Sequence, residues 1–316
     1  MLYLMTYINY LFRNLKFKFL AQLICLFLYY QDLLSQNNNF SFTELSDNAK
    51  VNALGGNNVS STHTDFLMNP SLIDKKIFSI NYLNYLLDIN SSSIMYSDSS
   101  KFLGNFGLGI KYLSHGKFEG YDLTGNYSSD FYPKEYIISF GKSYSFSKFK
   151  IGTNIKYFYS KLYENSKSAF LVDVGTIFKP IKNKELSIAI VASNIGFVLD
   201  ENISSPRSSL KIGTSFKPDY MPIRFSLTYV KKEKEADFKN FSIGIEVLLS
   251  KYLNIMIGYN HKIEKGFKIN NSNRLNGISY GLELILKRFN LNYSRLILNN
   301  ISGTNNISIN YNLRRN

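Results

Sequence analysis

The sequence predicts an all-β fold, a transmembrane antiparallel β-barrel of about 14 strands with an N-terminal plug segment. Three observations predict it. From Ile77 onward, apolar and polar residues alternate with the period of two that a strand requires. The alternating segments run about 9 to 12 residues, close to the length that a tilted membrane strand needs. Short and long connections also alternate along the chain, as they do in outer-membrane barrels.

Residues 1–36 are expected to be a secretory signal peptide. A short basic stretch precedes the apolar run Phe19–Tyr30, and polar residues follow it. This order is typical of a signal that is cleaved after export, here near Ser35 or Gln36. An uncleaved anchor is the alternative, although the run is short for a helix that crosses a bilayer. Met5 is an alternative start to Met1.

Cys25 is the only cysteine of the sequence, and it lies inside this apolar run. Cleavage near Ser35 would leave a mature chain without cysteine, which excludes disulfides and thiol chemistry from it. Leu23 and Ile24 precede Cys25, whereas lipoprotein processing favours a small residue next to the cysteine. No lipid anchor is therefore expected.

Residues 37–76 are expected to form a plug. Within Asn52–Ile73, the residues Gly55, Gly56, Asn69 and Pro70 exclude a continuous strand or helix of ordinary length. Irregular backbone at membrane depth is tolerated only inside protein or a water-filled cavity. We expect the plug to lie in the periplasmic mouth of the barrel, with a tight turn at the two glycines and an end at Asn69-Pro70. A flexible periplasmic tail is the alternative.

Residues 77–316 are expected to form the barrel itself. Its strands are expected to begin near residues 77, 91, 104, 134, 149, 168, 185, 208, 223, 240, 252, 277, 289 and 305. The count treats residues 104–123 as one long strand bent at Gly116, because a separate strand at Lys117–Leu123 would make the total odd. Both chain ends then lie on the side of the short turns. The longer connections are expected at Lys161–Lys167, Phe197–Pro206, Lys231–Lys239 and Lys262–Leu275.

The alternation also assigns the two faces of the wall. Apolar residues, with tyrosines near the strand ends, are expected to face lipid. The charged residues expected to point into the lumen are Lys111, Lys156, Asp173, Lys211, Arg224, Glu246 and Glu283. Charges of both signs would have to pair or be hydrated there. An ion-selective pore is the functional alternative to a structural network of lumen charges.

The sequence predicts no enzyme, cofactor or metal site. The three histidines, His63, His115 and His261, are far apart and have no metal-ligand spacing. Gly107-Leu108-Gly109 lies within a strand without a following helix, so it is not a dinucleotide-binding motif. The formal charge is +14, but the lysines are scattered, which does not favour a nucleic-acid partner.

Several stretches carry a family resemblance, which begins with Phe40–Leu45 and with Val51–Gly56, the latter containing the motif residues Leu54, Gly55 and Gly56. It continues at Asn69-Pro70 and at Asp88-Ile89-Asn90. Further stretches are Ser79–Tyr85, FGLGIKYLSHGKFEGYDLTGN, Ser193–Gly196 and SLKIGTSFKPDYMPIRFSLTY. On these residues the chain resembles the PorV/PorQ family of the type IX secretion system, and the Asn-Tyr-Leu-Asn-Tyr and Asp-Ile-Asn pieces are closer to PorQ. The family belongs to the wider group of FadL-like fourteen-stranded barrels.

The resemblance implies a non-enzymatic component of type IX secretion, integral in the outer membrane. It would scaffold the cell-surface attachment complex, with PorZ, PorU and PorV as partners and without a small-molecule substrate. The chain departs from the family at Asn-Pro-Ser, where Asn-Pro-Ala is usual, and at its Arg-Arg-Asn end, which lacks a terminal aromatic residue. The alternatives are a FadL-like transporter of hydrophobic small molecules, which needs an apolar pocket, and a simple diffusion porin, which needs an open lumen.

Overall fold

The computed structural model describes residues 41–61, 65–100, 103–122, 124–163, 165–181, 185–199, 208–232, 240–266, 275–299 and 302–313. The predicted signal peptide lies outside these ranges, as does His63. Within them, no helix is long and apolar enough to cross a membrane.

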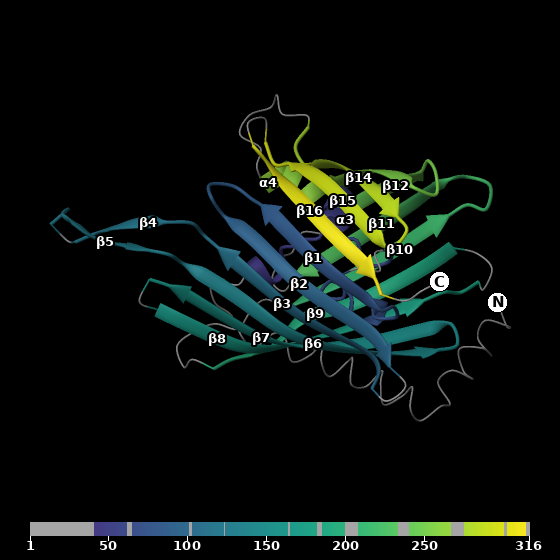
Figure 1. The fold of residues 1–316 in the computed structure, drawn as a ribbon, viewed down its shortest axis with the longest axis horizontal. Coiled ribbons are helices and arrows are strands. Elements are labelled where there is room, and N and C mark those ends of the chain that lie inside the picture. Colours follow the sequence, from purple (N-terminus) through teal and green to yellow (C-terminus); the bar gives the residue numbers. More distant parts are fainter. Residues whose placement is uncertain are drawn as a thin grey trace.

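Fourteen antiparallel strands close into a barrel, in the order β1-β16-β15-β14-β13-β12-β11-β10-β9-β8-β7-β6-β3-β2 (Figure 1). Their bounds are β1 Ile77–Asn84, β2 Asn90–Ser100, β3 Gly104–Ser114, β6 Lys134–Phe146, β7 Phe149–Leu162, β8 Asn165–Phe178, β9 Glu185–Val198, β10 Ser209–Lys217, β11 Ile223–Lys232, β12 Phe241–Leu248, β13 Leu253–Asn260, β14 Ile278–Leu286, β15 Phe289–Ile297 and β16 Gly303–Asn312. Pairing of Ile77 with Asn312 and of Asn84 with Asn305 closes the ring. Closure leaves no unpaired strand edge, so the predicted barrel is confirmed.

Two further strands lie outside the barrel. β4 (Phe118–Tyr121) and β5 (Tyr127–Phe131) form a two-stranded sheet that projects beyond the ends of β3 and β6 (Figure 1). We call this sheet the arm. The predicted single strand 104–123 is therefore interrupted: β3 ends at Ser114, and Gly116 adopts a φ of 82° at the bend. The strand count of fourteen was correct because the residues after Gly116 leave the barrel wall.

The connections divide between the two ends of the barrel. Residues 101–103, 147–148, 179–184, 218–222, 249–252 and 287–288 connect strands at the end where β1 begins and β16 finishes, which we call the terminus end. The other connections, with the arm and α4 (His261–Gly266), lie at the opposite loop end. Most of the longer connections occur there, as expected for an outer-membrane barrel.

The predicted long connection at Lys161–Lys167 is wrong. β7 and β8 each run 14 residues and stay paired up to Leu162 and Asn165, which leaves only residues 163–164 between them. Tyr163 has a φ of 54°, the left-handed conformation that tight hairpins use. Its ring also meets Phe131 of the arm edge to face, with centroids 5.0 Å apart. The polar residues that suggested a loop thus continue the two strands beyond the others.

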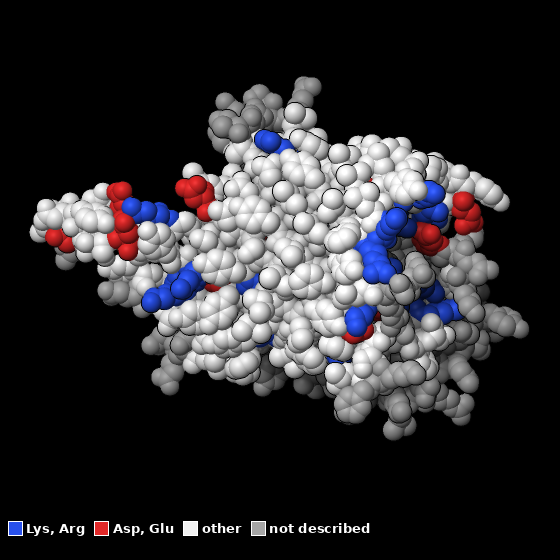
Figure 2. Space-filling model, viewed as in Figure 1, with Lys and Arg blue, Asp and Glu red and all other residues white. Residues whose placement is uncertain are grey.

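The outer wall is apolar between the two ends. Along β3, the outward-facing Leu108 and Ile110 are 49% and 58% exposed. Lys111, which faces the lumen, is 4% exposed. The same alternation recurs along the other strands, with Ile, Leu, Phe and Tyr outward and Ser, Asn, Gly and charged residues inward. On the face shown in Figure 2, Lys, Arg, Asp and Glu gather at the arm and at the opposite end. A belt of this kind is what hydrocarbon requires of a barrel wall.

The plug fills the lumen along its depth. It comprises η2 (Ser41–Thr43), α3 (Ala49–Ala53) and η3 (Pro70–Leu72) with the segments between them. At the loop end, Phe42 packs with Leu113 and Phe158. At the terminus end, the hydroxyl of Ser143 donates to the carbonyl of Ile73. The predicted plug is present, but its expected confinement to the periplasmic mouth is wrong, because it contacts the wall at both ends.

Glycines on the lumen side of the wall make room for the plug. A Cβ at Gly281 would lie 2.7 Å from the Cβ of Ala53, and one at Gly213 would lie 2.6 Å from Val59 Cγ2. Gly152 and Gly175 are closer still, since a Cβ there would overlap Pro70 and the amide of Asn69. Gly107 and Gly109, expected only as small lumen residues, face the ring of Phe66. The wall and the plug therefore fit because specific wall positions lack side chains.

Gly152→Ala should displace η3 without opening the barrel, because the added methyl would overlap the backbone of Pro70. In a Ser71→Cys background, the buried thiol should react with a maleimide about tenfold faster or more, as expected for an overpacking cost of about 1–3 kcal/mol. The control is Thr153→Ala, at the neighbouring exposed position of the same strand. Equal labelling rates in the two variants would contradict this account of the glycines.

Candidate functional site: the plugged lumen

The Leu54-Gly55-Gly56 motif ends the plug helix and joins it to the wall. Asn48 caps the start of α3, its Oδ1 accepting from the backbone N–H of Lys50 at 3.0 Å and of Val51 at 3.2 Å. Gly55 and Gly56 have φ values of 88° and 81°, which turn the chain sharply after the helix.

Three hydrogen bonds hold this turn against β13 and β14. Asn260 Nδ2 donates to the carbonyl of Gly55 at 2.7 Å, and Ser279 Oγ donates to the carbonyl of Ala53 at 2.9 Å. The N–H of Gly55 donates to Ser279 Oγ at 3.2 Å. Leu54 packs beside Met256. The motif predicted as a tight turn is a turn that is also bonded to the wall.

The Asn69-Pro70 step organises the terminus end of the plug. Asn69 Oδ1 accepts from the N–H of Ser71 at 3.0 Å and from its hydroxyl at 2.7 Å, and Pro70 occupies the first turn of η3. Asn69 Nδ2 donates to the carbonyl of Val59 at 2.9 Å. Both residues are buried, and β1 begins a few residues later at Ile77. The step therefore links two plug segments and ends the plug before the first strand.

A charged cluster joins α3 to the wall. The Nζ of Lys50 lies 2.6 Å from Glu246 Oε1 and 2.7 Å from Glu283 Oε2. Arg224 bridges Glu246 and Glu185, with 2.6 Å to each carboxylate. Of the predicted lumen charges, Glu246 and Glu283 are buried, and Arg224 has 23% of its side chain exposed. Lys50 was not predicted from the sequence, since its segment has no strand alternation that would assign it a face.

A second cluster lies on the β7–β9 side of the lumen. Lys156 Nζ lies 2.8 Å from Asp173 Oδ1 and donates to Asn194 Oδ1 at 2.6 Å. Asp173 Oδ1 also accepts from the N–H of Asn194 at 2.8 Å. Asn194 adopts a φ of 60°, where the strand register shifts, and its amide donates to Thr43 of the plug at 3.0 Å. This asparagine belongs to the Ser193–Gly196 stretch of the family resemblance.

The two remaining predicted charges have no ion pair within the described part of the chain. Lys111 Nζ donates to the carbonyl of Phe42 at 3.4 Å and to that of Leu45, and it lies 4.5 Å from the centre of the Phe42 ring. Lys211 lies 3.7 Å from the sulfur of Met68. Both side chains are buried, so the structure brings all seven predicted charges to the lumen side but not into one site.

The histidines lie apart from one another. His115 Nε2 is 3.0 Å from Glu135 Oε1, and the ring of His261 stacks on that of Phe241 with centroids 4.9 Å apart. Among the described residues, no group of three His, Cys, Asp or Glu side chains could hold a metal ion. The absence of a metal site and of enzymatic activity stays a prediction.

Comparison with known proteins identifies the fold. No family model and no curated protein sequence matches the chain. Solved structures do. The Pseudomonas putida toluene transporter TodX matches with a TM-score of 0.50 and 12% identity, over 82% of this chain and 95% of TodX. The Ralstonia pickettii toluene transporter TbuX matches with 0.52 and 10%, over 86% and 99%, and the CymD monoaromatic hydrocarbon channel with 0.52 and 9%, over 86% and 99%.

At these identities the comparison shows a shared fold. The chain shares the fold of these solved barrels, and with its apolar outer belt this fold supports an outer-membrane location. The comparison gives no evidence for or against membership of the PorV/PorQ family.

Lys50→Met should loosen the plug, because it leaves the buried Glu283 without its cation and Glu246 with Arg224 alone. The loss of one partner from a buried pair costs about 3–5 kcal/mol, so the temperature at which the folded band is lost in heat-modifiability gels should fall clearly. Lys76→Met, which breaks a more exposed pair with Asp98, is the matched control and should cost less than about 1 kcal/mol. Adding Glu283→Gln to Lys50→Met should restore part of the loss. An unchanged transition in Lys50→Met would mean that the cluster does not hold the plug.

Proposed function

We propose that this chain is a plugged, non-enzymatic barrel that scaffolds proteins at the cell surface, in the manner that its resemblance to the PorV/PorQ family implies. Its partners would be other components of type IX secretion, and it would need no cofactor. The observation that carries the proposal is the combination of a lumen bonded shut by the plug and an arm that extends beyond the barrel at the loop end (Figure 1).

The plug argues against a simple diffusion pore. Its contacts with the wall are hydrogen bonds and ion pairs between buried groups, and they occur at both ends of the lumen. An open state would expose all of these groups or require them to find new partners, which is costly for buried polar groups. A resting barrel of this kind passes ions poorly.

The arm offers a surface suited to a protein partner. Tyr121 and Tyr127 are 59% and 58% exposed, and their rings meet edge to face with centroids 6.2 Å apart. Tyr121 donates to the carboxylate of Glu119 at 2.7 Å. Phe118 stacks on Phe131 at 5.5 Å between centroids, which stiffens the base of the arm. Exposed tyrosines on a short sheet with open edges are typical of protein-binding surfaces.

The carboxylates of Asp122 and Asp130 on the arm stay ionised to lower pH than ordinary aspartates do. The Lys117 ammonium, 2.8 Å from Asp130, holds the pKa of that carboxyl below its ordinary value. Hydrogen bonds from Thr124 and Asn126 hold the pKa of Asp122 below its ordinary value. A partner for this arm would therefore present basic and aromatic groups.

The comparisons favour a second function, uptake of hydrophobic small molecules, and they give no support to a role in secretion. The matched barrels are named as toluene transporters and as a hydrocarbon channel. For this function the plug would have to leave or open an apolar path. Two cavities between plug and wall, of about 90 and 20 Å³, are instead bordered by lysines, aspartates and a glutamate. A third, lined mainly by apolar residues such as Phe66, Ile73 and Met95, measures only about 10 Å³.

The purified protein in planar bilayers should show little steady conductance, because the plug is bonded along the lumen. Lys50→Met should increase the frequency of open events, and Lys76→Met should not. A steady ohmic conductance of the unmodified protein would contradict a plugged scaffold and favour a pore.

Replacement of residues 118–131 by a short Gly-Ser turn should abolish the attachment of secreted cargo at the cell surface while the barrel still folds. The measurement is cargo on whole cells of a strain that lacks the chromosomal gene and carries either version, with co-purified outer-membrane partners analysed alongside. Unchanged export and attachment in the strain without the gene would refute the scaffold. A loss of hydrocarbon uptake in that strain, with attachment intact, would establish the second function.

A further inference from the structure

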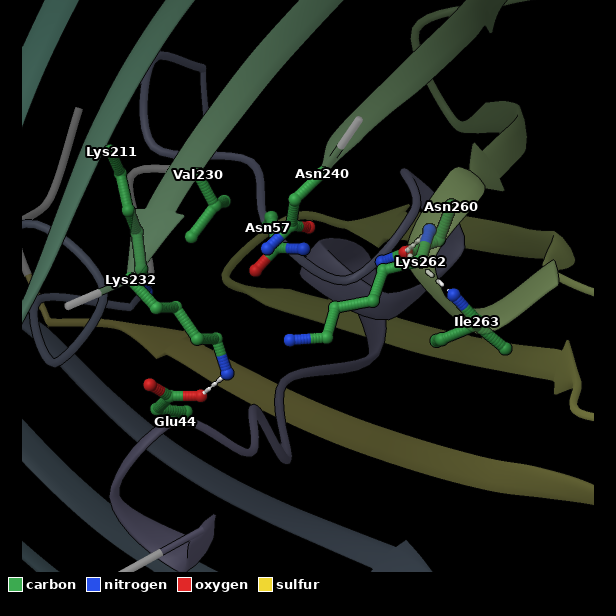
Figure 3. A pocket seen from close by; sticks show the side chains of 9 residues that line it. All are labelled: Glu44, Asn57, Lys211, Val230, Lys232, Asn240, Asn260, Lys262 and Ile263. Atoms are coloured by element: carbon green, nitrogen blue, oxygen red, sulfur yellow. Dashed lines mark hydrogen bonds and ion pairs between the residues drawn. The ribbon is translucent and has the colours of Figure 1, made fainter. Parts of the chain in front are cut away.

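A cavity of about 90 Å³ lies at the loop end of the lumen, between the plug and the β10–β13 wall (Figure 3). The plug, the ends of β11 and β13, and α4 converge on it. Its lining residues are Glu44, Asn57, Lys211, Val230, Lys232, Asn240, Asn260, Lys262 and Ile263. A volume of this size holds a few water molecules or one small polar group.

Lys211 is the unusual member of this lining. Its side chain is 5% exposed, and the neighbour that its Nζ reaches is the thioether of Met68 at 3.7 Å. A thioether is a weak acceptor and carries no charge. Within the described ranges no carboxylate lies at ion-pair distance from Lys211. A buried ammonium is costly unless an anion or strong acceptors surround it, so the cavity beside it is a place where an anion would be stabilised.

The charged side chains around the cavity also favour an anion. Three lysines, Lys211, Lys232 and Lys262, border it, against the single carboxylate of Glu44. That carboxylate is already paired with Lys232. Figure 3 shows Lys232 and Lys262 reaching into the same space from β11 and α4. Among the described lining residues, lysines therefore outnumber carboxylates, and amide groups of Asn57 and Asn240 lie beside them.

We propose that this cavity is a binding site for one oxyanion group, a carboxylate or a phosphate, with Lys211 at its base and Lys232 and Lys262 at its sides. The shared chemistry is a compact anion that accepts charge-assisted hydrogen bonds from ammonium groups. The oxyanion group belongs either to a free anion or to the headgroup of an amphiphile whose chain stays outside the cavity. The site does not depend on the scaffold role, since it uses no residue of the arm.

The test is a calorimetric titration of the purified full chain, in a non-ionic detergent, with inorganic phosphate and separately with dodecyl phosphate. Lys211→Met should weaken binding about tenfold or more, because it removes a charge-assisted contact worth about 1.5–3 kcal/mol. Lys251→Met, at an exposed lysine in the terminus-end connection 249–252, is the matched control and should change the affinity less than about twofold.

Binding of both ligands with similar affinity supports a site for a free anion, and binding of dodecyl phosphate alone supports a headgroup site. If wild-type protein binds neither, or if Lys211→Met binds as wild type does, the proposal is overturned. Heat-modifiability gels establish that each variant is folded. If Lys211→Met does not fold, Lys262→Met provides the same comparison from the exposed side of the cavity, and an unchanged affinity in it would overturn the proposal. The conductance and surface-cargo results leave this outcome unaffected.

Discussion

The structure depends on one constraint. The plug is an irregular segment in a poorly hydrated lumen, so its backbone N–H and carbonyl groups need hydrogen-bond partners outside regular secondary structure. The barrel solves this for its own strands by closing, since every strand then has two neighbours. The plug has only short helical turns, so its carbonyls and N–H groups bond to wall side chains. Ser279, Asn260, Ser187 and Ser308 on the wall provide such bonds. This explains why lumen-facing positions are rich in Ser and Asn.

The same constraint explains the lumen charges. Lys50 enters on a plug helix and meets two carboxylates from the wall, while Lys156 and Asp173 pair within the wall and connect to the plug through Asn194. Charges of opposite sign in a poorly hydrated interior are stable only together, so these pairs fix the position of the plug as well as neutralising each other. Among the described residues Lys211 has no carboxylate at ion-pair distance, which is why its cavity is the part of the lumen best suited to an external anion.

The barrel wall and the arm favour different functions. The barrel shares its fold with solved toluene transporters, whereas the arm extends beyond the barrel at the loop end. A barrel that transports needs a plug that can move out of the lumen. A barrel that scaffolds needs a rigid base for its protruding strands, and the edge-to-face contact of Phe131 and Tyr163 connects the arm to the extended β7–β8 hairpin in that way.

The amino-acid sequence by itself determined the barrel, its fourteen strands and the inward side of the wall, because strand alternation and turn residues are local features that repeat. It also indicated a plug, since Gly55-Gly56 and Asn69-Pro70 interrupt regular structure wherever they lie. Only the tertiary structure decided how deep the plug reaches, which wall glycines receive it, and that Lys50 joins Glu246 and Glu283. Residues 161–162 and 165–167 show the reason: their polar composition suits a loop, but cross-strand pairing with a neighbour keeps them in strands. Contacts between segments far apart in the chain leave no periodic trace in the sequence.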